Sequence, residues 1–301
     1  MLDNCEPLFG SAARASALLI TVNYKDGHAT IDLLASIHHA QDSSRVDVLV
    51  VDNGSSADEL SELKEAVAKY PNVDLMKSGQ NRGYFGAAKF GLSHYLERKH
   101  SLPDWVIVCN HDLLLPDAGF FHKLFNMDSK SVGMIAPRIQ VEADGIDQNP
   151  FMRRRPSTLY WGWLRLIYSN YAFTSAWHSL SRLKRLCKNL VKNNFRLGKD
   201  HPVCREVIYA PHGAFMIFSK RFFDAGGYLD DNLFLYWEEI SVSEICNSLR
   251  LPIVYEPVLR IHHKEHLSIG DGITRFTYNC YKNSFDYIRS KFLAKASLFQ
   301  N

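Results

Sequence analysis

Short apolar runs recur through the first half of the chain, separated by longer segments with helical periodicity. The runs lie at Ala17–Asn23, Val46–Val51, Val73–Lys77, Trp105–Cys109 and Val132–Ala136. The segments between them predict helices at Ala29–His39, Asp58–Tyr70 and Phe85–Arg98. Because these strands are apolar on both faces and alternate with helices, they indicate a mainly parallel sheet covered by helices on both sides. The sequence therefore predicts an α/β protein.

The second half of the chain resumes this pattern after an interruption. A basic segment from about residue 145 to residue 205 separates the two halves. Beyond it we expect a strand at Val207–Phe218, helices at Lys220–Ala225 and Ile240–Leu249, strands at Ile253–Tyr255 and Leu259–His262, and a helical tail at Thr274–Leu293. The 301 residues suffice for one large core.

Several protein classes are disfavoured by motifs that the sequence lacks. The six cysteines show no CxxC spacing, so neither a disulfide framework nor a zinc knuckle is indicated. No GxGxxG fingerprint occurs, which argues against a dinucleotide-dependent enzyme. The N-terminal residues do not resemble a signal peptide, and no apolar run approaches the roughly 18 residues of a membrane span. We expect a cytoplasmic protein.

The run Val50–Ser55 places polar groups at the end of a buried strand. Asp52 can accept hydrogen bonds from a nucleobase or a ribose hydroxyl, and Gly54 permits a tight turn. An ordinary strand-to-helix turn capped by Ser55 or Ser56 explains the same residues. The run alone does not decide between these interpretations.

Two acidic motifs stand at the ends of predicted elements. Residues 110–112, Asn-His-Asp, follow a predicted strand, where a carboxylate suits a divalent cation bound to a diphosphate. Glu238 and Glu239 begin a helix, where the helix dipole favours acids even without a catalytic role. Their catalytic interpretation is a general base that takes the proton of an attacking hydroxyl.

Histidines gather after the predicted strand Leu259–His262. Three imidazoles, of His262, His263 and His266, lie within five residues, although zinc would usually require further Cys or His ligands. The position after a strand favours one of them as a ligand.

Nine motifs follow one another in a fixed order. They are Ile20-Thr21-Val22-Asn23-Tyr24, Val51-Asp52-Asn53-Gly54-Ser55, Asn81-Arg82-Gly83, Asn110-His111-Asp112, Gly213-Ala214-Phe215-Met216, Gly226-Gly227-Tyr228-Leu229-Asp230, Tyr236-Trp237-Glu238-Glu239, His263 and Tyr281-Lys282-Asn283. In this order they resemble the inverting glycosyltransferases of family 2, and most of all the bacterial rhamnosyltransferase-like enzymes that build surface polysaccharides. The resemblance covers roughly residues 16–285, apart from the basic segment.

The resemblance implies the GT-A fold, the α/β fold of nucleotide-diphospho-sugar transferases, with a mainly parallel central sheet flanked by helices. It divides the chain into an N-terminal extension (1–15), a GT-A domain (16–270) with a basic, aromatic helical insertion at about 145–205, and a helical tail (271–301). It also implies a nucleotide-diphosphate sugar as donor and a glycan, or a lipid-linked glycan, as acceptor. Rhamnosyl transfer in O-antigen or capsule synthesis is one example.

The site residues are carried over from the resemblance position by position. Those that would bind the nucleotide sugar are Val22, Tyr24, Asp52, Asn81, Gly83, Asn110 and His212, although His212 is equally interpretable as a packed loop histidine. Asp112 matches the last acid of the family's DXD-type motif and, with His263, would bind Mg²⁺ or Mn²⁺. Glu239 matches the catalytic base, and Glu238 is the alternative base.

The sequence departs from the family pattern at these positions. The motif at residues 110–112 holds one carboxylate, the base position holds Glu rather than Asp, Ser241 replaces a frequent second Asp, and Lys89 stands where Asn is common. These departures weaken the site assignments and keep open a non-catalytic GT-A-like protein that binds a nucleotide sugar or scaffolds polysaccharide assembly. A sugar nucleotidyltransferase would require an N-terminal glycine-rich phosphate loop, and residues 23–27 supply little of one.

The basic segment is the strongest charge asymmetry of the chain. Residues 151–199 carry eleven Lys or Arg and no Asp or Glu, together with Trp161, Trp163 and Trp177. Cations beside aromatic residues favour an anionic membrane surface, and a lipid-linked acceptor at the inner membrane face would explain such a peripheral element. The alternative is an aromatic subdomain over the active site with a solvated basic face. No nucleic-acid-binding motif accompanies the charge, so a nucleic-acid partner is not expected.

Overall fold

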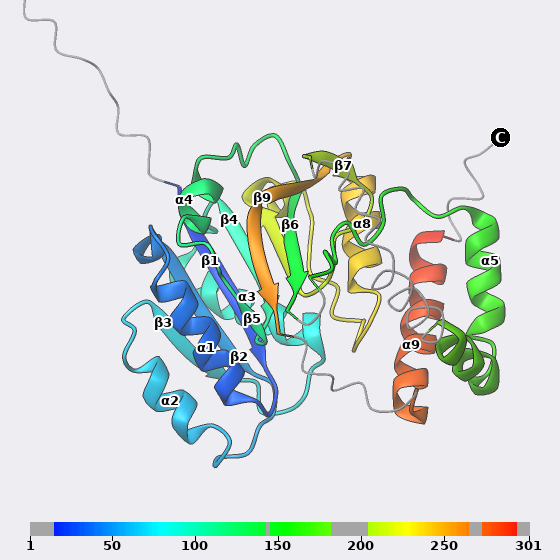
Figure 1. Ribbon diagram of the computed structural model, residues 1–301, viewed down its shortest axis with the longest axis horizontal. Helices are drawn as coiled ribbons and strands as arrows, with labels where there is room; N and C mark the ends of the chain where they lie inside the picture. Colours follow the sequence, from blue (N-terminus) through cyan, green and yellow to red (C-terminus); the bar gives the residue numbers. More distant parts are fainter. Residues whose placement is uncertain (1–14, 143–144, 182–203, 265–272, 294–301) are drawn as a thin grey trace, which may run out of the picture.

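The computed structural model describes residues 15–142, 145–181, 204–264 and 273–293 (Figure 1). Its strands are β1 (Ala17–Asn23), β2 (Val46–Asp52), β3 (Val73–Lys77), β4 (Trp105–Asn110), β5 (Leu113–Leu114), β6 (Met134–Val141), β7 (Glu206–Ile208), β8 (Phe215–Ser219) and β9 (Ile253–His263). The predicted extension before residue 15, the basic residues 182–203 and the end of the tail, from residue 294, lie outside the described residues.

The helices flank these strands. They are α1 (Gly27–His38), α2 (Ser61–Val67), α3 (Tyr84–Lys99), α4 (Phe120–Phe125), α5 (Thr158–Ile167), α7 (Lys220–Asp224), α8 (Glu238–Ser248) and α9 (Arg275–Ile288), with short turns at Ser43–Arg45 and Arg289–Leu293 and a further helix over residues 171–181. No helix among the described residues is both long enough and apolar enough to cross a bilayer.

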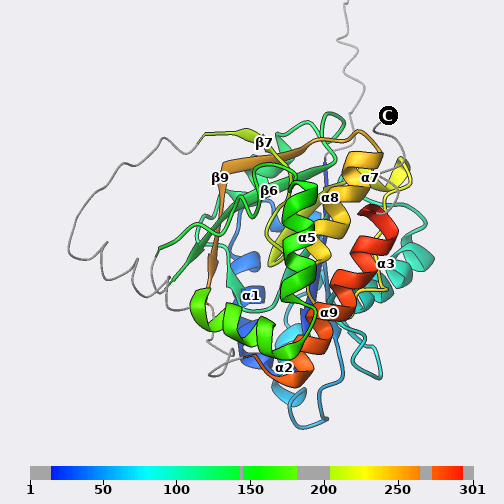
Figure 2. The ribbon, with the colours of Figure 1, turned by 90° about the vertical axis from the view of Figure 1, so that its right-hand side faces the viewer.

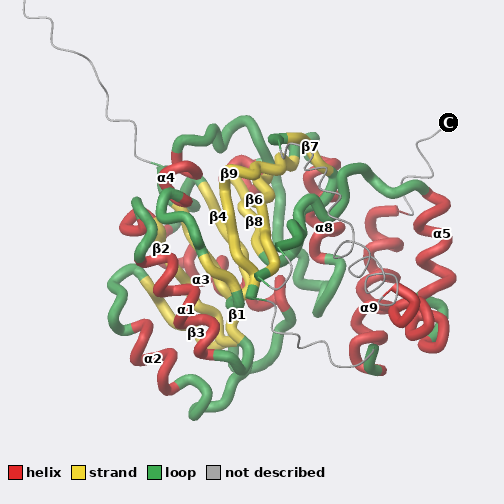
Figure 3. Tube along the Cα trace, viewed as in Figure 1, coloured by secondary structure: helices red, strands yellow, loops and turns green. Residues whose placement is uncertain are grey.

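The described strands form one nine-stranded sheet in the order β3-β2-β1-β4-β8-β6-β9-β5, with β7 paired to β9. Side chains alternate between its two faces along each strand. Leu19 packs with α1, α2 and α4, whereas Leu18 and Ile20 pack with α3, α7 and α8. Figure 3 shows the helices on both sides of the sheet. The predicted α/β architecture is therefore confirmed.

Parallel pairing brings the polar ends of three strands to one edge of the sheet. β1 pairs in parallel with both β2 and β4, with Asn23 opposite Asp52 and Val22 opposite Asn110. The carboxyl ends of such strands are where open α/β sheets bind ligands. The fold thus collects the polar motifs that the sequence places after separate strands.

The predicted strand Val207–Phe218 is wrong, because two strands, β7 and β8, replace it. Pro211 has no N–H to donate, and the segment 209–214 leaves the sheet between them. The two short strands predicted at 253–262 are instead one strand, β9, whose pairing with β6 shifts register between Pro137 and Arg138.

Other boundaries differ more modestly. β6 begins two residues later than the predicted strand Val132–Ala136 and continues five residues further, and α2 is shorter than the predicted helix Asp58–Tyr70. Helix α4 was not predicted, and α5 lies within the predicted helical insertion without having been predicted as a separate element.

The first part of the insertion packs as a helical layer beside the sheet domain. Trp161 and Leu164 of α5 lie in one buried cluster with Phe285 of α9 and Ile240 of α8. Figure 2, turned to face this side, shows α5, α8 and α9 next to one another. Packing of the aromatic residues as a subdomain is therefore observed for Trp161.

Among the described glycines, Gly83 leaves the least room for a Cβ, which leads to a stability prediction. Its φ is +74°, and a Cβ there would lie 1.9 Å from the backbone oxygen of Phe234. We expect Gly83→Ala to lower the free energy of unfolding by more than about 2 kcal/mol, measured by urea denaturation. Gly79 has a similar φ of +75° and nothing within 4 Å of a built Cβ. Gly79→Ala should therefore cost only about 1 kcal/mol, and equal losses would contradict the role of the Phe234 carbonyl.

Candidate active site

Asp52 lies buried at the end of β2, 2% exposed, within a network of short-range polar contacts. Its carboxylate accepts hydrogen bonds from the Ser55 amide at 3.3 Å and from Asn23 Nδ2 at 3.2 Å. Thr30 Oγ1 in turn donates to Asn23 Oδ1 at 2.8 Å. The carboxylate thus shapes the turn after β2. The expected helix cap at Ser55 or Ser56 is wrong, because α2 begins at Ser61 with Leu60 as its N-cap residue.

The turn before α3 is fixed to the turn after β2. Asn53 donates from Nδ2 to Asn81 Oδ1 at 3.0 Å and to the Gly83 carbonyl at 3.1 Å, while its Oδ1 accepts from the Arg82 amide at 2.8 Å. Two segments 28 residues apart therefore form one surface at the end of β2. Asn53 was not predicted as a site residue, although it lies within the polar run.

Asp112 faces His263 across the far end of this edge. Asp112 Oδ2 lies 3.3 Å from His263 Nε2, and His263 Nδ1 lies 2.7 Å from Gln148 Oε1. Burial acts to raise the pKa of Asp112, but the hydrogen bond and charge of His263, with His111 nearby, outweigh it and hold that pKa below its usual value. Asp112 is thereby kept as a carboxylate.

Asp112 and His263 fit a divalent cation whose remaining ligands come from elsewhere. Asp112 Oδ1 is buried and, among the described residues, has no hydrogen-bond partner. In the neutral ring, donation of Nδ1–H to the side-chain oxygen of Gln148 leaves the lone pair on Nε2, the nitrogen next to Asp112, for a cation. Within the described chain no group of three or more His, Cys, Asp or Glu is arranged for a metal. The protein would supply two ligands, and diphosphate oxygens and water the rest.

Glu239 approaches the same edge from α8. Its Oε1 accepts a hydrogen bond from the Gly213 amide at 3.2 Å, and the Gly213 carbonyl accepts one from the Tyr84 hydroxyl at 2.9 Å. Burial raises the pKa of Tyr84 well above its usual value, and the nearby groups Cys109, Glu238, Glu239 and Asp112 add to the rise. Tyr84 therefore stands within electrostatic reach of Asp112 and of both candidate bases.

Glu238 is a buried acid without full hydrogen bonding. It is 4% exposed, and its Oε1 has no hydrogen-bond partner among the described residues. Burial, with the adjacent Glu239 as second cause, raises the pKa of Glu238 to about 8. Burial also raises the pKa of Glu239. Burial is thus the first cause of the raised pKa at both candidate bases.

His212 lies between the two halves of the site. Its ring centroid is 6.3 Å from that of His263, and its amide donates to Asn149 Oδ1 at 2.7 Å. Burial and the charge of His263 lower the pKa of His212 to about 4, so the ring is neutral at physiological pH. A neutral imidazole at this position can exchange hydrogen bonds with a sugar hydroxyl.

Of the remaining predicted site residues, Val22 and Asn110 lie at the carboxyl ends of β1 and β4, and Tyr24 directly follows β1. The Val22 carbonyl lies 3.1 Å from His111 Nδ1, and the Asn110 amide donates to the Ala214 carbonyl at 2.9 Å. Tyr24 is 42% exposed. The sequence did not predict the positions of Tyr84, Gln148 and Asn149 in the site. No motif distinguishes Gln148 and Asn149 from the start of the insertion.

The buried acid predicts an unusual pH dependence of stability. Because the pKa of Glu238 is about 8 in the folded protein and near 4.5 when exposed, the folded state keeps a proton that the unfolded state loses. Stability from this group should therefore fall as pH rises from about 5 to above 8.

Glu238→Gln should remove this loss, so that the variant gains at least about 1 kcal/mol relative to the parent between pH 5.5 and pH 8.5. Thermal unfolding at the two pH values measures the difference. Glu97→Gln changes an acid whose side chain is 77% exposed and is the matched control. A parallel pH profile for all three proteins would contradict burial of the acid.

Comparison with known proteins identifies the family and the fold of the chain. The model "Glycosyl transferase family 2" matches residues 17–187. An N-acetylglucosaminyl-diphospho-decaprenol L-rhamnosyltransferase of Mycobacterium tuberculosis is 27% identical over 256 residues, which are 82% of this chain and 76% of that protein. The low-salt glycan biosynthesis hexosyltransferase Agl10 of Haloferax volcanii is 27% identical over 281 residues, covering 93% of this chain and 76% of that protein.

The fold is shared with solved structures of low sequence identity. The crystal structure of GalNAc-T7 with UDP, GalNAc and Mn²⁺ superposes with a TM-score of 0.58 at 14% identity. The match covers 95% of this chain and 52% of that one, so this chain spans about half the length of that protein. The fold is therefore GT-A, as the motif order implied. Since the family match spans more than half of the sequence, the chain belongs to glycosyl transferase family 2.

Proposed function

We propose that this glycosyltransferase moves a sugar from a nucleotide-diphosphate sugar to an acceptor hydroxyl with inversion, with Glu239 as the base. The observation that carries the proposal is the position of Gly213. Its amide contacts the Glu239 carboxylate, and the next residue's carbonyl contacts the backbone of Asn110, two residues before Asp112. Glu239, proposed to act on the acceptor, and Asp112, proposed to act at the diphosphate, are thus both connected to the short segment 213–214.

The proposed reaction is a single displacement. The Glu239 carboxylate takes the proton of the acceptor hydroxyl while that oxygen forms a bond to the anomeric carbon. The bond between this carbon and the diphosphate oxygen breaks, and its electron pair leaves with the nucleoside diphosphate. Burial, which raises the pKa of Glu239, makes the carboxylate a stronger base for this proton. Glu238 would keep the surroundings of Glu239 less polar as a neutral acid.

A divalent cation, Mg²⁺ or Mn²⁺, would be held by Asp112 and His263 and would neutralise charge on the departing diphosphate. The unpartnered Asp112 oxygen supports this assignment, as does the Mn²⁺ in the related GalNAc-T7 structure. Asp52, Asn81 and Gly83 would receive the nucleoside on the other side of the edge. His212, between the two halves, would contact the sugar.

The acceptor that we propose is a glycan carried on a lipid diphosphate, as in surface polysaccharide synthesis. The mycobacterial relative, named as a transferase acting on a diphospho-decaprenol, supports this class, and a rhamnosyl donor is consistent with it. Such an acceptor would be met on the cytoplasmic side of a membrane. The basic residues 151–199 would then contact its anionic surface.

Two substitutions test the roles of the acids. Glu239→Gln removes the base and should lower the transfer rate by about 10²–10⁴-fold. Asp112→Ala removes the carboxylate opposite His263 and should lower transfer at least as strongly. Release of nucleoside diphosphate from the donor measures both. Glu97→Gln and Asp128→Ala, at exposed positions, should keep the parental rate; unchanged turnover in both site variants would overturn the assignments.

The donor class can be identified by ligand-induced stabilisation. We expect one nucleoside diphosphate, and its sugar, to raise the unfolding temperature more than the others do, and Mn²⁺ to enlarge the shift. A panel of nucleotides with and without Mn²⁺ measures it. Asp112→Ala should lose the Mn²⁺-dependent part only. Stabilisation without any turnover of the same donor would instead favour a non-catalytic nucleotide-sugar-binding protein.

A further inference from the structure

We propose that one face of the insertion, formed by α5 and the helix of residues 171–181, enters the surface of an anionic lipid bilayer. We name it the outer face, and its residues are Leu159, Trp163, Leu166, Phe173, Trp177 and Leu180. The inference deepens the proposed function and rests on it, because a lipid-linked acceptor would be met at such a surface.

Helix α5 is apolar on two opposite sides. On its inner side Trp161 and Leu164 are at most 6% exposed and pack toward the sheet domain. On the other side Leu159 is 84% exposed and Leu166 is 61% exposed. A surface helix of a globular protein normally turns a polar side outward. Burial in the core of this domain therefore does not explain the outward apolar side chains of α5.

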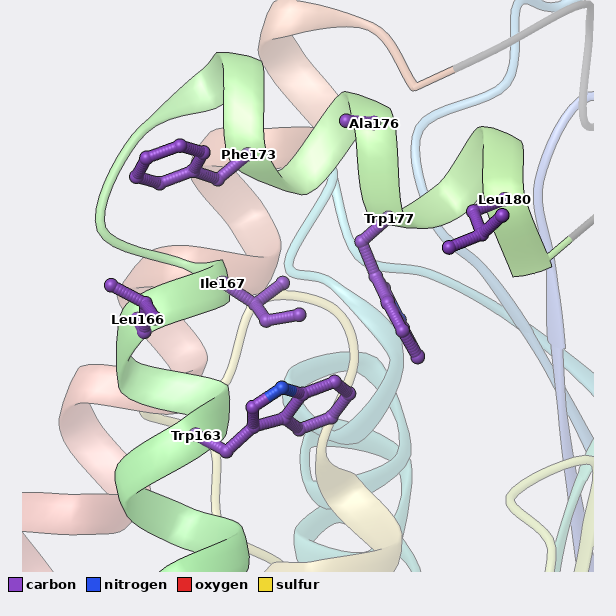
Figure 4. A pocket seen from close by; sticks show the side chains of 7 residues that line it. All are labelled: Trp163, Leu166, Ile167, Phe173, Ala176, Trp177 and Leu180. Carbon is purple, nitrogen blue, oxygen red and sulfur yellow. The ribbon is translucent and has the colours of Figure 1, made fainter.

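The helix of residues 171–181 extends the same face. Phe173 is 52% exposed and Leu180 is 47% exposed. Between the two helices lies a cavity of about 250 Å³, lined by Trp163, Leu166, Ile167, Phe173, Ala176, Trp177 and Leu180 (Figure 4). An apolar patch that is contiguous and exposed marks an interaction surface.

The outer face is preformed by contacts between its two helices. The rings of Trp163 and Trp177 meet edge to face with centroids 4.5 Å apart. Thr174 Oγ1 donates a hydrogen bond to the Ile167 carbonyl at 2.9 Å, across the turn that joins the helices. Binding would thus require little ordering of these side chains.

Charge around the outer face favours a bilayer over a second copy of the chain. Arg165 is exposed within α5, and the Arg275 guanidinium lies 4.5 Å from the Tyr171 ring centroid at the start of the second helix. The sequence that follows, residues 182–199, adds seven Lys or Arg and no acid. Two copies joined through this face would bring like charges together. An anionic bilayer offers acyl chains to the apolar side chains, headgroups to the cations, and the interfacial position that Trp prefers.

The outer face is held rigidly to the catalytic helix. Arg155, just before α5, donates from Nε and Nη2 to the two carboxylate oxygens of Glu244 at 2.7 and 2.9 Å. The Tyr209 hydroxyl donates to the same carboxylate at 2.6 Å. Glu244 is buried in α8, whose first turn carries Glu239. A bilayer bound at the outer face would therefore lie at a constant distance from the base.

Vesicle flotation tests the inference on the full chain without any substrate. The parent protein should float with vesicles of equal phosphatidylglycerol and phosphatidylcholine at low salt, and less with phosphatidylcholine alone. Leu166→Gln combined with Phe173→Gln removes apolar contact without changing charge. This double variant should lower the partition coefficient about tenfold or more. Brominated acyl chains should also quench the parent's tryptophan fluorescence, and Trp163→Phe with Trp177→Phe should remove most of that quenching.

The matched control changes two equally exposed apolar residues elsewhere. Val207 and Val258 are 68% and 49% exposed and lie on β7 and β9. Val207→Gln combined with Val258→Gln should float like the parent. Failure of the parent to float at low salt would overturn the inference, as would equal flotation of both double variants. Dissociation of a dimer by Leu166→Gln with Phe173→Gln, with flotation unchanged, would assign the outer face to self-association and also overturn it.

Donor turnover separates this inference from the proposed function. Nucleoside diphosphate release without vesicles should be the same for the parent and for the Leu166→Gln, Phe173→Gln variant. If the donor is turned over but flotation is the same with and without the outer-face substitutions, the inference alone is overturned. Flotation that depends on the outer face in a protein with no turnover on any donor would leave the inference standing and overturn the proposed function.

Discussion

The arrangement of this site depends on hydrogen bonds made by the backbone of Gly213 and Ala214. The Gly213 amide holds the Glu239 carboxylate, its carbonyl accepts the Tyr84 hydroxyl, and the Ala214 carbonyl accepts the Asn110 amide. The backbone of these two adjacent residues thereby joins helix α8, the start of α3 and the end of β4. A Cβ at Gly213 would lie 2.5 Å from Glu239 Oε1, so only glycine allows the acid to come this close.

The acids of the site are placed in environments that move their pKa values in opposite directions. Asp112, beside His263 and His111, has a lowered pKa and stays ionised, which suits a cation or diphosphate site. Burial raises the pKa of both Glu238 and Glu239, and the neighbouring Glu239 adds to the rise at Glu238. Divergent environments for carboxylates in one site are the usual way in which a fold assigns different tasks to the same chemical group. The cost is a buried Glu238 carboxyl group, one oxygen of which has no hydrogen-bond partner among the described residues.

The same helix that presents the acids also anchors the insertion. Glu244, near the middle of α8, takes the bidentate contact of Arg155, and Trp237, just before α8, packs against Trp161 with ring centroids 5.8 Å apart. Both Tyr236 and Trp237 have positive φ, at 70° and 73°, so the backbone entering α8 is strained. Packing of Trp237 on the insertion holds that conformation. The insertion thus helps to position the start of α8, which carries Glu238 and Glu239, as well as extending the surface.

The sequence by itself determined the α/β class, the exact extents of β1 and β3, and the fact that Asp52 and Asp112 come at or just after the ends of strands. These follow from local rules, because apolar runs and their polar ends are written in consecutive residues. It did not determine that residues 207–218 break into two strands, or that Gln148 and Asn149 reach His263 and His212. Those contacts join segments more than 60 residues apart. Only the tertiary structure decides them, because burial, the pKa values of the acids and the two-sided exposure of α5 depend on which distant segments pack together.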